Sequence, residues 1–447
     1  MHSQQYQKVR DYQNEAVENA ILALKNKKYR PSLIVIPTAG GKSFVIAELI
    51  RRLGDPPTLV LQPNVELLSQ NYNKFKLLGG EASLYSASVN SREISNVTYA
   101  TIGSIKNDFA NFQHIKYVII DEAHLGTDSQ SMIVNFIKNL DPSVKVLGLT
   151  ATPLKLKSYK IDGYYYSQLN ILTRMRPKFW KDIIHVTQIK QLYEQKWLCP
   201  LRFTAFDFGL RKVSTSGSDY DMKKVSKLLI DKGVISFTAN LIKTSIAKGK
   251  KKILVFAPTV EDCYLIKKLI PELEIISAKT PKEERKVIVN NFVNGDLKVV
   301  ANYGTLTTGF DAPTIDLIIM VRPTQSYFLY YQMVGRGMRI ALNKLLCDII
   351  DLSGNYAEFG DPKDLIIEDH PIEGWCLFVN DMLISGTPFG QKIPKDGLGE
   401  KVTFGKYKGQ LYKDVPPSYW QYLKANIDLT TSWAKKHIVK PLNKLGI

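Results

Sequence analysis

Short runs of β-branched residues alternate with longer amphipathic stretches through about the first 150 residues, and the pattern starts again in the second half of the chain. The first set of runs is Leu33–Ile36, Thr58–Leu61, Tyr117–Ile120 and Val144–Leu149. The second set is Ile253–Phe256, Lys298–Ala301, Leu317–Met320 and Cys347–Ile350. Continuous apolar strands separated by helices are typical of parallel sheets that are covered on both faces. The sequence therefore predicts an α/β protein with two tandem parallel-sheet domains.

The two sets of runs divide the chain into four segments. We predict a first domain at 1–155, a basic and aromatic insertion or linker at 156–202, a second domain at 203–358 and a C-terminal region at 359–447 with a small module at 400–447. A chain of 447 residues is too long for one ordinary core, which agrees with this division. The stretch from Leu154 to Arg202 breaks the alternation and holds ten basic, three acidic and eight aromatic residues.

The charge balance indicates a polyanionic partner. The chain has 60 Lys and Arg against 42 Asp and Glu, a formal net charge of +18. Nucleic acid is the simplest partner for such a surface, and a charged surface that serves only solubility is the alternative.

Cysteine usage and hydropathy exclude several classes of protein. The four cysteines stand far apart without a C-x-x-C pair, so neither a disulfide framework nor a zinc site is predicted, and a reducing compartment is favoured. The first residues lack the order of a signal peptide, and no apolar run approaches the roughly 20 residues that span a bilayer. We expect a soluble protein of a bacterial or phage-infected host cytoplasm that makes no membrane contact.

A glycine-rich segment, Pro37–Ser43, stands where a strand ends and a helix begins. Backbone N–H groups at such a junction hold phosphates, Lys42 reaches the β- and γ-phosphates of ATP, and Ser43 supplies an oxygen to Mg²⁺. The strict spacing would place glycine at position 36, where this chain has isoleucine, so the match is to G-K-S and its context. The alternative is an ordinary glycine-rich turn.

The sequence Asp121-Glu122-Ala123-His124 follows the run Tyr117–Ile120. Asp121 can hold Mg²⁺, while Glu122 can position and deprotonate an attacking water. An acidic loop at a strand end is the alternative, but the order of phosphate loop and then D-E-A-H, both at strand ends where open α/β sheets bind ligands, favours an ATPase.

With these motifs the chain resembles superfamily two helicases, whose core is a pair of RecA-like P-loop domains. The resemblance runs from about Gln7 to Asn355 and implies several roles in the first domain. Arg10 and Gln13 would read adenine, and Thr38, Gly40 and Gly41 would hold phosphates with Lys42 and Ser43. Nucleic-acid contacts would come from Gln62, Pro63, Asn64, Thr101 and Gly103, and coupling from Thr150 and Thr152.

The resemblance continues in the second domain. Arg336 and Arg339, one helical turn apart in Gln332–Arg339, would act on the γ-phosphate as arginine fingers, and Gln332 would couple the two sites. Gly309 and Asp311 would contact the nucleotide, and Thr259, Thr307 and Thr308 would contact nucleic acid. Asp351–Asn355 resembles a D-x-x-G-N segment of UvsW-like and RadD-like repair helicases of phages and bacteria. The family usually has glycine at position 39, and Ala39 is tolerated there if its φ is negative.

The tail carries a different signal, Phe404–Gly409, which resembles an F-G-K-x-K-G module appended to some DNA exonucleases and phage proteins. From Lys401 to Ile447 there are nine Lys and two Asp, with aromatic residues interleaved. This composition favours a nucleic-acid contact, and a small packed cap with a solvated lysine face is the alternative.

Together these features predict an ATP- and Mg²⁺-dependent DNA helicase of replication, recombination or repair. Its DNA would be single-stranded, forked or branched, and the protein would act as a monomer or small assembly. An RNA helicase, a duplex translocase that does not unwind, and a nucleic-acid-binding scaffold with a vestigial ATPase remain alternatives.

The insertion suggests a hypothesis for strand separation. A ring among Tyr164, Tyr165, Tyr166, Phe179 and Trp180 would stack on the last base pair, while Lys155, Lys157 and Lys160 hold phosphates. Alternatively, these rings fill the crevice between domains.

Overall fold

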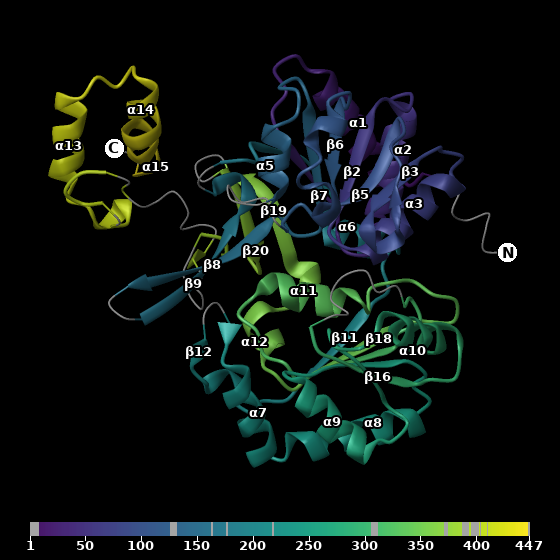
Figure 1. Ribbon diagram of the computed structural model, residues 1–447. Coiled ribbons are helices and arrows are strands. Elements are labelled where there is room, and N and C mark those ends of the chain that lie inside the picture. The colour runs from purple at the N-terminus through teal and green to yellow at the C-terminus, as the bar shows by residue number, and fades with distance from the viewer. Residues whose placement is uncertain are drawn as a thin grey trace.

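The computed structural model describes residues 9–125, 132–161, 164–175, 178–216, 219–304, 312–370, 374–386, 393–394, 402, 404–408 and 410–445. Two α/β lobes lie one above the other in Figure 1, and a small helical module at the C-terminus stands apart from them. The predicted pair of parallel-sheet domains is confirmed.

The first lobe is built on an eight-stranded sheet with the order β10-β1-β7-β6-β2-β5-β3-β4. Its strands are β1 (Ser32–Val35), β2 (Thr58–Gln62), β3 (Ser83–Ser86), β4 (Ser91–Arg92), β5 (Val97–Thr101), β6 (Tyr117–Ile120), β7 (Lys145–Thr150) and β10 (Asp182–Val186). All pairs are parallel except β3 with β4. Every residue of β1, β2 and β5 is buried, so the sheet is covered on both faces, as their uninterrupted apolar sequences predict.

One helix of this lobe precedes the first strand, and the others follow strands of the sheet. They are α1 (Asp11–Lys25), α2 (Lys42–Arg52), α3 (Val65–Leu77), α4 (Ile102–Ile105) and α5 (Met132–Lys138). α2 begins at Lys42 after the left-handed residue Gly41, and α3 begins after Asn64, whose side chain accepts a hydrogen bond from the Leu67 N–H. Both helix starts follow strands that end at the same edge of the sheet, where a ligand can meet them.

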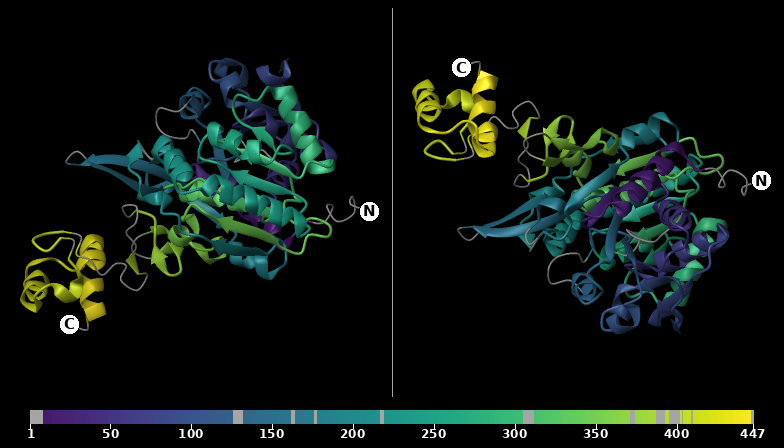
Figure 2. Two further views of the ribbon diagram at one scale, coloured as in Figure 1. Left: turned by 90° about the horizontal axis from the view of Figure 1, so that it is seen from below. Right: turned by 90° about the horizontal axis from the view of Figure 1, so that it is seen from above.

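The segment predicted as an insertion is in part a component of the first lobe. β8 (Leu154–Ile161) and β9 (Tyr164–Ile171) form an antiparallel hairpin that projects from the body of the molecule (Figures 1 and 2). After it, β10 pairs with β1, and α6 (Ile189–Glu194) follows. The boundary at 156 is therefore wrong for β10, because this strand closes the edge of the first sheet.

Trp180 does not form a separating wedge, since it is only 1% exposed and belongs to the core of the first lobe. A Cβ atom on Gly148 of β7 would lie 2.5 Å from its ring, so a glycine at this position makes room for the indole. Phe179 packs edge-on against Trp180 with ring centroids 4.9 Å apart. The side chains of Tyr164, Tyr165, Tyr166 and Lys160 lie outside the described residues.

The second lobe has a six-stranded parallel sheet with the order β11-β18-β17-β14-β16-β15. Its strands are β11 (Leu201–Ala205), β14 (Ile253–Phe256), β15 (Glu274–Ile276), β16 (Val299–Asn302), β17 (Leu317–Met320) and β18 (Cys347–Asp351). Its helices are α7 (Met222–Asp231), α8 (Val234–Ala247), α9 (Val260–Leu269), α10 (Lys282–Asn294), α11 (Tyr327–Gly335) and α12 (Asn355–Phe359), and a short hairpin joins β12 (Thr215–Ser216) to β13 (Asp219–Tyr220). The lobe begins at Leu201, two residues before the predicted boundary.

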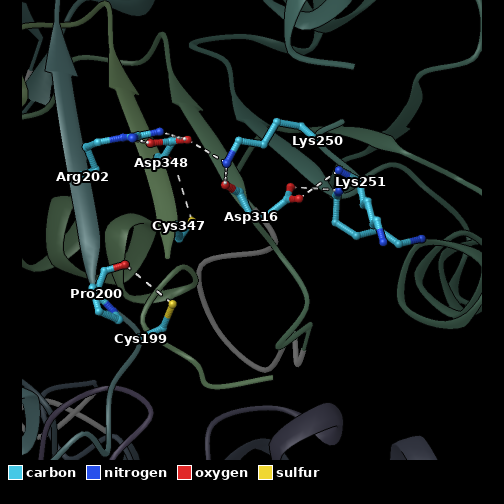
Figure 3. A network of polar contacts seen from close by, with 9 residues as sticks. Cys199, Pro200, Arg202, Lys250, Lys251, Asp316, Cys347 and Asp348 are labelled. Atoms are coloured by element: carbon cyan, nitrogen blue, oxygen red, sulfur yellow. Dashed lines mark hydrogen bonds and ion pairs between the residues drawn. The ribbon is translucent and has the colours of Figure 1, made fainter. Parts of the chain in front are cut away.

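A polar network joins the amino ends of four strands in this sheet (Figure 3). The Asp348 carboxylate accepts hydrogen bonds from Arg202 Nε at 2.6 Å and Nη2 at 3.0 Å, and Lys250 Nζ lies 2.6 Å from it. Lys250 also donates to the Asp316 carbonyl at 2.8 Å. Burial raises the pKa of Asp348, but the two cations outweigh it and leave the pKa below its ordinary value. The network lies at the edge opposite the carboxyl ends of the strands, so we interpret it as structural.

After the second lobe the chain returns to the first. A four-stranded antiparallel sheet contains β19 (Leu365–His370), β20 (Gly374–Val379), β21 (Met382–Leu383) and β22 (Ile393–Pro394). The Gln188 amide, just before α6, donates to the Ile367 carbonyl at 2.7 Å and accepts from the Ile367 N–H at 3.2 Å. The predicted C-terminal region is therefore not one unit, because this sheet packs against segments of the first lobe.

The terminal module has a core of its own. It contains α13 (Pro417–Asn426), α14 (Ser432–Ala434), a π-helical turn (Lys435–Val439) and α15 (Lys440–Leu445). Its buried residues form a cluster separate from both lobes, centred on Trp420, which is fully buried. Figure 2 shows the module apart from the lobes in both views.

Candidate active site

The phosphate loop follows β1 and leads into α2. Gly41 has a φ of +81°, which favours glycine, and a Cβ atom there would lie 2.5 Å from Gln13 Nε2, so a larger residue would also displace the Gln13 amide. The N-terminal turn of α2, with Lys42 and Ser43, opens into a cleft of about 510 Å³. Unpaired N–H groups at this helix start form the kind of site that binds phosphate.

Ala39 does not meet the condition of a negative φ under which alanine is tolerated at this position. Its φ is +66°, in the left-handed region where a Cβ atom is strained. Glu122 also has a positive φ, +49°. Ala39 and Glu122, both with a strained backbone, therefore line the same cleft.

The two predicted carboxylates lie at the carboxyl end of β6 and face the phosphate loop. Lys42 Nζ lies 3.3 Å from Glu122 Oε1. Asp121 Oδ2 accepts a hydrogen bond from Asn71 Nδ2 at 2.8 Å, and its Oδ1 accepts from the Glu122 N–H at 2.9 Å. Asn71 of α3, which the sequence analysis did not select, thus orients Asp121 toward the cleft.

Burial and neighbouring charges shift the pKa values of Asp121, Glu122 and His124 in different directions. Burial, together with the negative charge of Glu122, raises the pKa of Asp121 to about 6. Burial also raises the pKa of Glu122, but Lys42, His124 and Arg336 outweigh it and leave that pKa below its ordinary value. Burial lowers the pKa of His124 to about 4, so its ring is neutral near pH 7. Glu122 is therefore a carboxylate that can accept a proton.

The residues available at this site fit Mg²⁺. Asp121 and Ser43 line the same cleft and present a carboxylate and a hydroxyl, the hard oxygen donors that Mg²⁺ prefers. Over the described ranges, no group of three or more His, Cys, Asp or Glu side chains could hold a metal ion. A site with one protein carboxylate suits an ion whose other ligands are phosphate oxygens and water.

His124, Thr150 and Phe328 connect the first lobe to the second. His124 Nδ1 lies 3.0 Å from Thr150 Oγ1, and the His124 ring lies 4.0 Å from the ring of Phe328 on α11. Thr150 Oγ1 also bonds with the backbone of Thr152, donating to its carbonyl at 2.9 Å and accepting from its N–H at 3.1 Å. A chain of contacts thus runs from Glu122 through His124 to the second lobe, where the sequence predicted coupling.

The second lobe supplies one wall of the cleft. Gln332, Arg336 and Arg339 line it together with Lys42 and Glu122. α11 ends at Gly335, so Arg336 begins a turn over 336–338 and Arg339 follows that turn, instead of the two lying one helical turn apart. A Cβ atom on Gly335 would lie 2.9 Å from the Thr38 side chain, and the Thr38 N–H donates to the Tyr331 hydroxyl at 3.0 Å. The lobes are therefore in contact at the phosphate loop.

The cleft is also lined by Arg10, Gln13 and Trp197. The Arg10 guanidinium lies 4.1 Å from the centre of the Trp197 ring, and Gln13 Nε2 donates to the Gly40 carbonyl at 3.2 Å. Trp197 was missed because its sequence neighbours suggested only an aromatic linker.

Lys344 is a second residue that the sequence analysis missed. Its Nζ donates to the carbonyls of Gly337 at 2.8 Å, Arg339 at 2.9 Å and Pro313 at 3.0 Å. Burial lowers the pKa of this ammonium. One cation thus holds the backbone that carries both arginines, and no sequence signal distinguished it from the other lysines.

A second groove, of about 670 Å³, is lined by several of the residues that were predicted to contact nucleic acid. Pro63, Asn64, Thr101 and Gly103 line it. Lys282 of α10 donates to the Ser88 carbonyl at 3.1 Å, so the second lobe borders this groove.

The other predicted nucleic-acid residues are placed elsewhere. Gln62 is fully buried, which removes its side chain from any surface contact. Thr259 caps α9, since its Oγ1 accepts from the Asp262 N–H at 3.0 Å. Thr307, Thr308, Gly309 and Asp311 lie outside the described residues.

Comparison with known families agrees with the two lobes and their cleft. Residues 6–155 match the family model described as type III restriction enzyme, res subunit, and residues 235–341 match the helicase conserved C-terminal domain. The chain belongs to the superfamily two helicases, a class of ATP-hydrolysing enzymes with two RecA-like domains.

Individual relatives match most of this chain. The putative ATP-dependent helicase IRC3 of Saccharomyces cerevisiae is 25% identical over 77% of this chain and 51% of its own length. The DNA 3'-5' translocase XPB2 of Sulfurisphaera tokodaii is 27% identical over 74% of this chain and 78% of its own. This chain spans about half the length of the yeast relative.

A solved structure confirms the fold. A putative HsdR subunit fragment of a type I restriction enzyme from Vibrio vulnificus superposes with a TM-score of 0.59 at 20% identity, over 78% of this chain and 65% of that chain. Among the helices described here, none has the length and apolarity that a membrane span requires.

Proposed function

We propose that this chain hydrolyses ATP in the cleft between its lobes and uses the resulting motion to translocate on DNA and separate its strands. The observation that carries the proposal is the shared lining of one cleft by Lys42 and Glu122 from the first lobe and by Arg336 and Arg339 from the second. Residues from two lobes around one nucleotide make hydrolysis depend on cleft closure, which is how a motor couples chemistry to movement.

The residues divide the chemistry as follows. Lys42 and the N-terminal turn of α2 bind the β- and γ-phosphates, and Asp121 and Ser43 hold Mg²⁺. When bound there, Mg²⁺ would supply positive charge to offset the charge on the phosphate oxygens. Glu122 orients the attacking water and accepts its proton, since its lowered pKa leaves it ionised at neutral pH. Arg336 and Arg339 stabilise charge on the γ-phosphate in the transition state.

Nucleic acid would follow the groove lined by Asn64, Thr101 and Gly103. The name of the archaeal relative refers to DNA, which supports DNA as the substrate here. We propose forked or branched DNA in replication, recombination or repair, handled by a monomer or small assembly. The four cysteines are all free thiols, which is consistent with work in a bacterial or phage-infected cytoplasm.

The β8–β9 hairpin is our proposed strand-separating element, because it projects from the body (Figure 2) and belongs to the basic stretch from Leu154 to Arg202. Tyr165→Ala should reduce unwinding and spare DNA-stimulated hydrolysis. A variant that unwinds normally would assign strand separation to another part of the chain.

The decisive experiment measures ATP hydrolysis and strand displacement on forks, overhangs and four-way junctions in DNA and RNA forms. We expect DNA-stimulated hydrolysis and displacement of branched DNA, both abolished in Lys42→Ala. Preference for RNA would indicate an RNA helicase, and stimulation without displacement would indicate a duplex translocase. Absence of hydrolysis in the wild-type protein would leave a binding scaffold.

A further inference from the structure

Residues 404–408 of the F-G-K-x-K-G segment form a turn between two groups of aromatic rings. On one side, Phe404 packs edge-on against Trp433 with ring centroids 4.7 Å apart, and Trp433 lies 5.2 Å from His437. On the other side, Tyr407 lies 4.8 Å from Tyr419. One turn therefore joins rings from α13 and α14.

Tyr422 extends the second group. Its ring stacks on Tyr419 with centroids 6.5 Å apart and planes inclined by 22°. Gly405 allows the turn to approach so closely, because its φ is +69° and a Cβ atom there would lie 2.3 Å from the Tyr419 hydroxyl. The glycine of the motif is thus explained by the packing of the turn, whereas its two lysines are not.

Two rings remain open to solvent although the module has a complete core. Tyr422 is 60% exposed and Trp433 is 44% exposed, while Trp420 is fully buried. Exposed hydrophobic side chains mark a binding surface when they gather together, and these two rings belong to the two groups on either side of one turn.

Positive charge accompanies these rings. Lys406 and Lys408 belong to the turn, and Lys424 and Lys435 lie on the adjoining helical segments; all four side chains are exposed. Lys406 Nζ lies 5.4 Å from the centre of the Tyr407 ring. Between Lys401 and Ile447 lysines outnumber aspartates nine to two. A surface of this composition complements a polyanion that also offers flat apolar faces.

We propose that the terminal module binds single-stranded DNA by stacking bases on Trp433 and Tyr422 and holding phosphates with Lys406 and Lys408. A duplex is a poor occupant, because its base faces are stacked on one another and cannot reach the rings. The module gives the motor a second grip on the strand, separate from the groove in the first lobe. The proposal rests on the proposed DNA substrate and adds a site that ATP hydrolysis does not require.

The test uses the full chain and a fluorescent oligothymidylate, with binding followed by anisotropy in the absence of ATP. Trp433→Ala and Tyr422→Ala should each weaken binding roughly tenfold, since stacking on one ring contributes a factor of this order. Tyr264→Ala is the matched control, because Tyr264 is 57% exposed on α9 of the second lobe. The control should bind like wild type, and all three variants should keep basal ATP hydrolysis.

Two further measurements separate stacking from a folding defect. Trp433→Phe keeps a ring and should restore most of the affinity. Lys406→Gln with Lys408→Gln should reduce the slope of log affinity against log salt by about 1.4, the value expected for two phosphate contacts on a single strand.

Unchanged oligothymidylate affinity in the ring variants would overturn the proposal, as would an equal loss for a blunt duplex. An equal loss in Tyr264→Ala would also overturn it. A failure of the proposed ATP-driven function would be distinguishable from a failure of this proposal. A wild-type protein that does not hydrolyse ATP could still bind oligothymidylate through the rings of the module.

Discussion

Lys42 Nζ lies 3.3 Å from Glu122 Oε1, and the two side chains are only 12% and 13% exposed. The cation that would bind phosphate thus holds the carboxylate that would take the proton from water. This contact ties the start of α2 to the end of β6 and keeps Glu122 ionised.

Glu122→Gln should bind ATP with near wild-type affinity and lower turnover by about 10²- to 10⁴-fold, because an amide keeps the shape and loses the base. Nucleotide binding by fluorescence titration and steady-state hydrolysis would measure the two effects. Normal turnover in the variant would remove Glu122 from the catalytic role.

Arg336→Ala and Arg339→Ala should each lower turnover far more than ATP affinity, with a loss of about 10³-fold or more for an arginine finger. The matched control is Arg51→Ala, since Arg51 pairs with Glu48 on α2 and is 54% exposed. A loss confined to affinity would contradict action on the transition state.

Lys344→Met should lower the turnover number about tenfold and leave the KM for ATP unchanged, because it releases the backbone that carries Arg336 and Arg339 without touching the nucleotide. Lys344→Arg should restore part of the activity. Lys232→Met is the control, because Lys232 also donates to a backbone carbonyl in the second lobe, that of Phe208 at 2.7 Å. Equal effects of the two Met variants would indicate general destabilisation.

Ala39→Gly should raise the free energy of unfolding by about 0.5–1 kcal/mol. Relief of the left-handed strain contributes about 1–2 kcal/mol, and the larger backbone entropy of glycine in the unfolded chain offsets part of it. Urea unfolding would measure the change. Ala247→Gly, at the exposed end of α8, should instead destabilise by about 1 kcal/mol; if both variants destabilise, Ala39 is not strained.

Asp348→Asn should lower the free energy of unfolding by about 1–2 kcal/mol and spare ATP hydrolysis, since the network of Figure 3 lies away from the cleft. Arg202 is 66% exposed, so solvent screening keeps its share small.

This effect should depend on pH with a defined sign. The folded-state pKa of Asp348 is lowered, so its stabilisation is fully present above about pH 5 and is lost as pH falls through that pKa. Urea unfolding of both proteins at pH 7 and pH 3 would show the difference shrinking in acid. A difference that persists unchanged at pH 3 would contradict an ionic origin.

The sequence alone located four strands of each parallel sheet and the position of the phosphate loop. The run Tyr117–Ile120 is β6 to the residue, and α2 begins at Lys42, within the segment Pro37–Ser43 where a strand was predicted to give way to a helix. Both predictions are correct because the features depend on neighbouring residues. Strands buried on both faces need continuous apolar residues, and a loop that holds phosphate needs glycine before a helix start.

Tertiary structure decided the roles of residues that contact segments far away in the sequence. Trp180 is a core residue because Gly148 leaves room for it, and β10 belongs to the first lobe because β1 has an open edge. Lys344 acquires a role only when three carbonyls from separate positions converge on its ammonium. Local sequence does not predict such contacts, because they depend on packing across the whole chain and not on the propensities of neighbouring residues.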